Sequence, residues 1–255
     1  MTTRFSWYEL MTLDTAAAKD FYGAVIGWQT QKWEAADYTM WTAAIGPVGG
    51  LMTLPEQAKA MGAPPHWMGY LSVANVADVA TRATELGGRV YVPPTELPDG
   101  ARFAVLADPT GASFGVHQSA PNAPAMAERG RGLGEFSWGE LMTSDPAAAW
   151  RFYATLFGWV SSGSMDMGPE TGSYDMFTTH EGANSIGGMM KLPPGVPVSN
   201  WLHYINVADV AATIAQVKER GGTVLYGPQE VPGGGQIAAF IDPQGAAFAV
   251  YAHVG

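Results

Sequence analysis

The sequence predicts an α+β protein made of two tandem domains, each built from paired βαβββ units. Two observations support this fold class. A stretch near the start of the chain recurs almost unchanged in its second half, which indicates an internal duplication. Within each copy, a segment with the two-residue period of a strand is followed by one with the 3.6-residue period of a helix. The duplication therefore predicts the number of domains, and the succession of strand-like and helix-like segments predicts the fold class.

The duplicated stretch begins at Trp7 in the first copy and at Trp138 in the second, 131 positions later (138 − 7). Both copies contain Glu-Leu-Met-Thr, then Asp, Phe-Tyr and Gly-Trp at that same separation. We therefore expect one domain over residues 1–118 and a second over 135–255. Residues 119–134 between them have no apolar period and are expected to form a linker.

The first unit of each copy is predicted as a strand that leads into a helix. Residues 5–12 alternate as a two-faced strand does. Asp14 stands at the N-cap position, and Gly27 is a plausible helix stop. In the second copy Asp145 is the expected cap, and Pro146 takes the first helical position, where a missing N–H is harmless.

The later elements are predicted from turn signals and apolar periods. In the first domain we expect strands at 39–45, 51–54, 67–73, 89–92, 102–107 and 112–118. A helix capped by Asn75 should end at Gly87-Gly88. We expect a loop or short helix at 55–65, a loop at 93–100, and turns at 46–50 and 108–111. In the second domain Gly187-Gly188 and Gly233-Gly234-Gly235 are predicted to form hairpin turns or a flexible pocket rim, since neither lies between a strand and a helix as phosphate loops do.

Composition narrows the range of partners. The 255 residues carry a net charge of −10, which argues against nucleic acid and against an anionic membrane surface. There is no cysteine, so thiol chemistry is excluded. No secretory leader and no membrane-spanning run is recognisable, so a cytoplasmic protein is expected. The 9 tryptophans and 13 methionines suit either a large core or apolar pockets, and both interpretations stay open.

The paired βαβββ units, the Asp-capped helix with Phe-Tyr and Gly-Trp, and the closing Asp-Pro-x-Gly turn resemble the vicinal oxygen chelate (VOC) superfamily. That group includes glyoxalase I, bleomycin-resistance proteins and extradiol dioxygenases. The resemblance implies a curved mixed sheet around a concave pocket in each domain. It also implies a small-molecule ligand and a monomer or homodimer. The fold carries both metalloenzymes and binding proteins, so it does not decide the function.

The resemblance also says where metal ligands would lie. In the metalloenzyme members the ligands are His, Gln and Glu, and the matching positions hold other residue types here. The positions are Trp7, Met52, Met68 and Gly115 in the first domain and Trp138, Met190, Leu202 and Ala249 in the second. Divalent metals prefer carboxylate or imidazole ligands, so no metal site and no cofactor is predicted.

Two glutamates are the candidate catalytic residues. Glu9 and Glu140 follow Trp7 and Trp138 by two positions, so strand alternation places each on the face of its tryptophan. A carboxylate beside an indole in a cavity can act as an acid or base, or grip a cationic group. The alternative is a structural glutamate that accepts backbone N–H bonds.

The remaining candidates are ligand-binding residues. They comprise the eight residues Trp7, Tyr38, Met52, Met68, Trp138, Tyr174, Met190 and His117, together with His203, the histidine expected to point inward from its strand.

These residues and the family resemblance support two hypotheses about the function. The first is a protein that binds a small, largely apolar or aromatic molecule in a metal-free pocket of one or both domains. The second is a lyase or dioxygenase with a displaced divalent-metal site, in which Glu9 or Glu140 and a nearby histidine are ligands.

Overall fold

The computed structural model describes residues 3–123, 130, 132–169 and 171–253. Each sequence repeat forms one eight-stranded mixed sheet. The strand order is β2-β3-β4-β1-β5-β8-β7-β6 in the first sheet and β10-β11-β12-β9-β13-β16-β15-β14 in the second. No helix among the described residues is long and apolar enough to cross a membrane.

The first repeat contains two βαβββ units in sequence. The first unit consists of β1 (Phe5–Thr12), α1 (Thr15–Val25), β2 (Gln29–Trp33), β3 (Tyr38–Ala43) and β4 (Gly46–Thr53). A short helix, α2 (Glu56–Ala60), leads to the second unit, which consists of β5 (His66–Ser72), α3 (Val76–Glu85), β6 (Arg89–Glu96), β7 (Arg102–Ala107) and β8 (Ser113–Gln118).

Within its described residues, the second repeat has the same order of elements without a counterpart of α2. Its first unit consists of β9 (Phe136–Thr143), α4 (Pro146–Phe157), β10 (Val160–Asp166), β11 (Ser173–Thr178) and β12 (Gly187–Lys191). Its second unit consists of β13 (Asn200–Asn206), α5 (Val210–Glu219), β14 (Thr223–Val231), β15 (Gly235–Ile241) and β16 (Ala247–His253).

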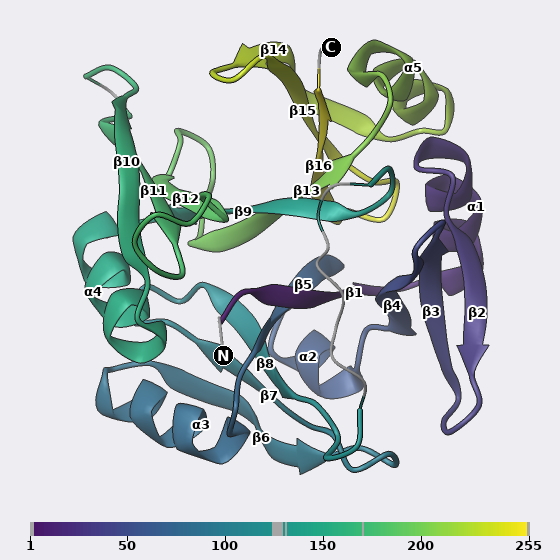
Figure 1. Cartoon of the computed structure of the whole chain (residues 1–255). Helices are drawn as coiled ribbons and strands as arrows, with labels where there is room; N and C mark the ends of the chain where they lie inside the picture. Colours follow the sequence, from purple (N-terminus) through teal and green to yellow (C-terminus); the bar gives the residue numbers. More distant parts are fainter. Residues whose placement is uncertain (1–2, 124–129, 131, 170, 254–255) are drawn as a thin grey trace. The chain divides into compact units, whose positions relative to one another are not determined.

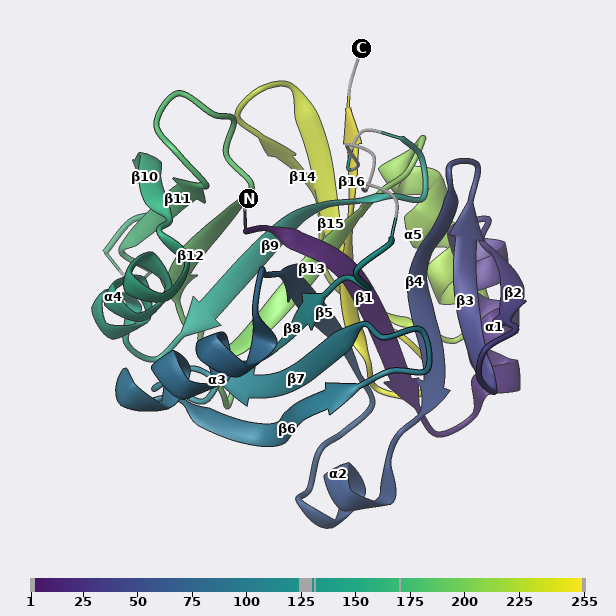
Figure 2. The same ribbon diagram turned by 60° about the horizontal axis from the view of Figure 1, so that its bottom comes forward.

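The compact units of the structure take one half from each repeat. The α1–α5 unit contains described residues 7–68, 130, 132–137 and 203–253, and the α3–α4 unit contains the rest of the described chain. In both views α1 lies beside α5, and α3 lies beside α4 (Figures 1 and 2). Each helix therefore packs against a helix from the other half of the sequence.

A buried hydrogen-bond chain ties the two sequence halves together inside the α1–α5 unit. The Tyr22 hydroxyl on α1 donates to Asp242 Oδ2 at 3.1 Å and accepts from Trp67 Nε1 at 2.9 Å. Burial, and then the charge of Asp242, raises the pKa of Tyr22 well above its usual value. Tyr22 thus stays protonated and links α1 to the turn between β15 and β16, which lies 220 residues away along the chain.

The α3–α4 unit repeats this arrangement. Trp201 Nε1 donates to the Tyr153 hydroxyl at 3.0 Å, and Tyr153 lies beside Asp108 of the β7–β8 turn. Trp159 stacks on Phe177 with ring centroids 4.2 Å apart. Five tryptophans, including Trp28, Trp41 and Trp67 of the other unit, are buried in such aromatic clusters. For these five the core interpretation is correct.

The local predictions of strands and caps agree with the structure at most positions. Asp14, Asn75 and Asp145 accept backbone N–H bonds at the starts of α1, α3 and α4. Pro146 is the first residue of α4, and Gly27 follows α1 with a positive φ of 82°. Of the predicted linker, residues 124–129 and 131 lie outside the described chain. Its last residue, Gly134, accepts a hydrogen bond from Trp28 Nε1 at 2.8 Å.

Three loop predictions are wrong. Gly46–Gly50 forms the first part of β4 and not a turn, and Gly187-Gly188 begins β12. These glycines permit close approach, because a Cβ atom at Gly49 would lie 2.4 Å from the Tyr8 carbonyl oxygen. Strand β6 also continues to Glu96, because it pairs with β7 through two register shifts, so the loop predicted from Pro93 begins later.

Candidate functional site

The first candidate site is a hydrogen-bond chain that crosses three strands of the α1–α5 unit. Trp7 and Glu9 lie on β1, and Tyr38 lies at the start of β3. Trp7 Nε1 donates to the Tyr38 hydroxyl at 3.1 Å, and that hydroxyl donates to Glu9 Oε1 at 2.6 Å. Glu9 is only 8% exposed. The structure thus adds Tyr38 to Trp7 and Glu9, which strand alternation had placed on one face, around one buried carboxylate.

Gly50 makes this arrangement possible. Strand β4 runs between β3 and β1, and Gly50 pairs with Glu9 on one side and with Met40 on the other. A Cβ atom at Gly50 would lie 1.6 Å from the Tyr38 hydroxyl oxygen and 2.4 Å from Cζ. The Tyr38 side chain therefore crosses β4 directly above a glycine to reach Glu9.

The electrostatics of the group fix the roles of its members. Burial, and then the negative charge of Glu9, raises the pKa of Tyr38 far above its usual value. Tyr38 consequently keeps its proton and is a hydrogen-bond donor at neutral pH. A carboxylate that accepts a short hydrogen bond from a neutral phenol is held in one orientation and can accept further bonds from a ligand.

The α3–α4 unit contains the counterpart. Trp138 Nε1 donates to the Tyr174 hydroxyl at 2.8 Å, and Glu140, 9% exposed, pairs with Gly188 in the ladder between β9 and β12. A Cβ atom at Gly188 would lie 2.3 Å from the Tyr174 ring. The glycine beside the glutamate is therefore required in both repeats. Sequence reasoning interpreted both glycines as turn or rim residues and missed that they leave room for a tyrosine ring.

Two of the three methionine candidates lie on the strands that carry these glycines. Met52 follows Gly50 by two positions on β4 and is half-buried, as is Met190, which pairs directly with Tyr174. Met68 on β5 is 4% exposed. Their thioethers are soft, polarizable groups that suit contact with an aromatic ligand better than coordination of a hard cation.

The residues at the metal-ligand positions do not fit a divalent metal. Gly115 pairs with Tyr70 in the β5–β8 ladder, and the Tyr70 ring covers it, 2.1 Å from where a Cβ atom would lie. In the second repeat the equivalent pair is Tyr204 and Ala249. Indole, thioether, glycine and alanine are not ligands that such ions prefer. Within the described chain, no group of three or more His, Asp or Glu side chains is placed to hold a metal ion.

The two candidate histidines lie elsewhere. His203 on β13 is 1% exposed and meets the Tyr8 ring edge-on at 5.0 Å. Tyr8 alternates with Trp7 and Glu9 along β1, so His203 packs on the opposite face of that strand. Burial lowers the pKa of His203 to about 3. His117 lies on β8 of the α3–α4 unit, where burial also lowers its pKa.

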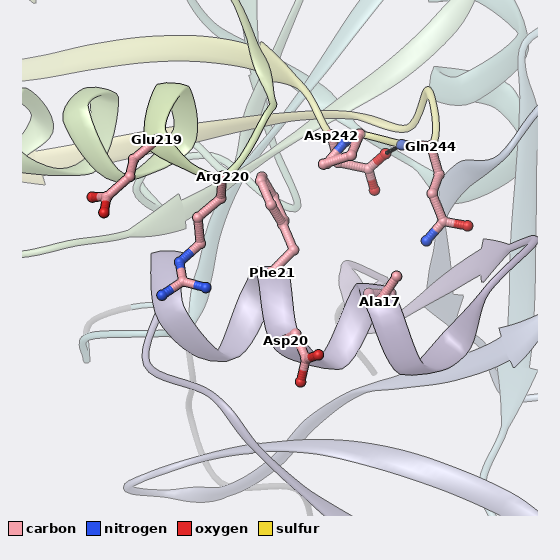
Figure 3. Close-up of a pocket in the computed structure, with 9 residues that line it drawn as sticks. Ala17, Asp20, Phe21, Glu219, Arg220, Asp242 and Gln244 are labelled. Atoms are coloured by element: carbon pink, nitrogen blue, oxygen red, sulfur yellow. Dashed lines mark hydrogen bonds between the residues drawn. The ribbon is translucent and has the colours of Figure 1, made fainter.

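A cleft of about 430 Å³ lies in the α1–α5 unit between α1, the C-terminal end of α5 and the β15–β16 turn (Figure 3). Gln244 of that turn accepts a hydrogen bond from the backbone N–H of Asp14 at 2.6 Å and donates to its carbonyl at 2.8 Å. In the α3–α4 unit the position of Arg220 is taken by Leu86, which packs on the core. None of the predicted site residues lines the cleft. Gln244, in the β15–β16 turn that borders the cleft, holds the start of α1 in place.

Comparison with known proteins agrees with this architecture. The family model of the Glyoxalase/Bleomycin resistance protein/Dioxygenase superfamily matches residues 4–116 and again residues 135–250. The chain therefore belongs to this superfamily, and it consists of two tandem VOC domains of the α+β class. The resemblance and the fold class predicted from the sequence are confirmed.

Its curated relatives have different names. One is "Putative glyoxylase CFP32" of Mycobacterium bovis, 33% identical over 96% of this chain and 93% of the relative. Another is "Anthracycline biosynthesis protein DauV" of a Streptomyces species, 28% identical over 97% of this chain and 94% of the relative.

Solved structures share the fold at low sequence identity. The Mn(II)-bound glyoxalase from Novosphingobium aromaticivorans superposes with a TM-score of 0.67 at 17% identity. The match covers 99% of this chain and 84% of the glyoxalase chain. The 2,3-dioxygenase LapB from Pseudomonas sp. KL28 gives 0.66 at 12% identity, with coverage of 99% and 92%.

Proposed function

We propose that this protein binds a small, largely apolar or aromatic molecule against Trp7, Tyr38 and Glu9, and against their counterparts in the second repeat, without using a metal ion. The observation that supports the proposal most directly is the buried Glu9 carboxylate held by the Tyr38 hydroxyl at 2.6 Å. It stands two residues from the position where the metalloenzymes of the family carry a ligand. A carboxylate fixed by a phenol replaces a metal ion as the polar anchor.

Each residue has a distinct role in this proposal. The Trp7 indole and the Met52 thioether supply apolar contact, and Glu9 accepts a hydrogen bond from a hydroxyl or amine of the ligand. Tyr38 is a positioning residue, because its proton is already donated to Glu9. The relative named for anthracycline biosynthesis suits an aromatic ligand.

The second candidate is a metal-dependent lyase or dioxygenase, and it is favoured by the relative named as a glyoxylase. It requires Glu9 or Glu140 to bind a divalent ion together with a histidine. The geometry supports it less well, because the His203 ring lies on the opposite face of β1 from Glu9.

The expected setting is the cytoplasm, with the protein as a monomer or homodimer. The net charge of −10 is unfavourable for binding nucleic acid or an anionic membrane, so a small neutral or cationic molecule is the expected partner.

Equilibrium dialysis of the full chain with 2-naphthol and 2-methylnaphthalene in a chelating buffer tests the proposal. Wild-type protein should bind both probes. Glu9→Gln and Glu140→Gln should weaken 2-naphthol binding and leave the free energy of unfolding within about 1 kcal/mol, since the amide still accepts a hydrogen bond while burial of a charge is relieved.

The matched control is Glu34→Gln, which changes an exposed glutamate in the same unit and should alter neither property. Absence of probe binding by the wild type would sink the proposal. A loss of stability of about 1–3 kcal/mol in both variants with binding intact would identify the glutamates as structural acceptors.

A further inference from the structure

Two neighbouring rows of side chains cross the strands of the Glu9 site on one face of the sheet, and both rows end on the edge strand β2. The first row consists of Glu9, Gly50, Met40 and Gln31. The second row consists of the pair Met11 and Met52 and the pair Tyr38 and Trp33. All of these residues belong to the α1–α5 unit, so the rows form one surface of that unit.

The second repeat has two equivalent rows within the α3–α4 unit. On its three inner strands the rows contain the same residue types, namely Glu140, Gly188 and Met176 in the first row and Met142, Met190 and Tyr174 in the second. On the edge strand β10, Gly163 takes the place of Gln31 and Met165 takes the place of Trp33. In these rows the two repeats therefore agree around the glutamate and differ at the edge of the sheet.

Trp33 extends the first site beyond Tyr38. It is half-buried and pairs directly with Tyr38 across the β2–β3 ladder. The ring centroids of the two residues lie 6.3 Å apart, and their planes meet at 79°. At its other end Tyr38 donates its hydroxyl to Glu9. Glu9, Tyr38 and Trp33 therefore form a continuous surface with a carboxylate at one end and an upright indole at the other.

The length of a ligand decides whether it uses this indole. A phenol that lies along Tyr38 with its hydroxyl at Glu9 matches the Tyr38 side chain in length, so its ring stays about as far from Trp33 as the Tyr38 ring does. A second fused ring extends toward Trp33 and brings the two aromatic systems closer together. Aromatic pairs attract at centroid separations of about 4.5–7 Å, so the second ring gains a contact that the phenol makes weakly.

The edge of the second repeat offers a different surface. A Cβ atom at Gly163 would lie 3.0 Å from the terminal methyl group of Met176, so that methyl group covers the position that Gln31 has in the first repeat. Met165 pairs with Tyr174 and supplies a flexible thioether where Trp33 supplies a rigid ring. Flexible methionine surfaces adapt to ligands of different shape and select weakly among them.

From these rows we infer that Trp33 is a specificity-determining residue of the first repeat, which selects a ligand with two or more fused aromatic rings over a one-ring ligand with the same hydroxyl. The second repeat, with Met165 at the equivalent position, discriminates less between the two. The inference rests on the proposed function, because it assigns the ligand class of the site around Glu9.

The test exchanges the two edge residues and uses 2-naphthol and phenol, which share the hydroxyl and differ by one ring. In equilibrium dialysis of the full chain, Trp33→Met should weaken 2-naphthol binding by about two- to tenfold, the value of one aromatic pair, and phenol binding by less than about twofold. Met165→Trp, the reciprocal variant, should strengthen 2-naphthol binding by a similar factor. A poorly folded variant cannot produce such a gain.

The matched control is Lys32→Met, which introduces a methionine at the neighbouring position of β2. The Lys32 side chain is 82% exposed and lies on the opposite face of the strand, so this variant should affect neither probe. Equal losses of 2-naphthol and phenol binding in Trp33→Met would mean that the indole supports the site without selecting for ring number. Unchanged 2-naphthol binding in both exchange variants would mean that the ligand does not reach the edge strand. Either result overturns the inference while the proposed function stands, whereas a wild type that binds neither probe would overturn both.

Discussion

Gly50 offers the sharpest test of how the Glu9 site is built. Its backbone is not in the positive-φ region, so alanine is acceptable to the main chain. The new methyl group, however, would lie 1.6 Å from the Tyr38 hydroxyl oxygen. Because the Tyr38 ring would have to leave, Gly50→Ala should break the bonds from Trp7 to Tyr38 and from Tyr38 to Glu9.

The expected cost follows from those two bonds. A hydrogen bond to a charged group contributes about 1.5–3 kcal/mol and a neutral one about 0.5–1.5 kcal/mol. Replacing glycine by alanine also stabilises the protein by about 0.4–1 kcal/mol, because it reduces the conformational entropy of the unfolded chain. We therefore expect Gly50→Ala to lower the free energy of unfolding by about 2 kcal/mol, and to weaken 2-naphthol binding.

Urea unfolding of four proteins measures this: wild type, Gly50→Ala, Tyr38→Ala and the double variant. Once Tyr38 is truncated, Gly50→Ala should cost less than about 0.5 kcal/mol, because nothing is left to displace. Gly23→Ala, within α1 and in ordinary contact with its neighbours, is the control and should not destabilise. Equal costs of Gly50→Ala in both backgrounds would refute the proposed placement of Tyr38 over the glycine.

Three further predictions concern stability. His203 has a pKa of about 3 because it is buried, whereas a histidine in the unfolded chain titrates near 6.5, so the unfolded chain binds the extra proton as the pH falls. The free energy of unfolding should therefore drop by about 2 kcal/mol between pH 7 and pH 5. Urea titrations at both pH values should show that His203→Phe largely removes this loss. Tyr22→Phe leaves Trp67 and Asp242 without their shared hydroxyl and should cost about 2–4 kcal/mol by thermal unfolding; a cost below 1 kcal/mol would refute a structural role for this chain of bonds. Gln244→Ala removes the side-chain bonds to Asp14 at the exposed start of α1 and should cost only about 1 kcal/mol in the same assay.

Local signals predicted most of the fold. Asp14 and Asn75 were recognisable as caps because the residues that they cap follow immediately in the sequence. Strand alternation alone placed Glu9 beside Trp7. The fold class followed from the duplication, which needs no knowledge of long-range contacts.

Contacts between residues that are far apart in the sequence could not be predicted from local signals. The bond between Tyr22 and Asp242 joins residues 220 positions apart, and no local pattern says that α1 packs against the other repeat. Gly50 was interpreted as a turn residue because glycine signals both turns and close approaches, and only the position of Tyr38 distinguishes the two. A glycine pair that recurs within a strand of both repeats was the available signal.

The metal content of the protein tests the central claim most directly. Full-length protein, prepared without a chelator or a histidine tag, should contain far less than one equivalent of any divalent metal by elemental analysis. It should also bind 2-methylnaphthalene with the same dissociation constant before and after treatment with EDTA. A stoichiometric divalent ion, whose removal abolishes binding and whose return restores it, would contradict a metal-free site organised around Glu9 and Glu140.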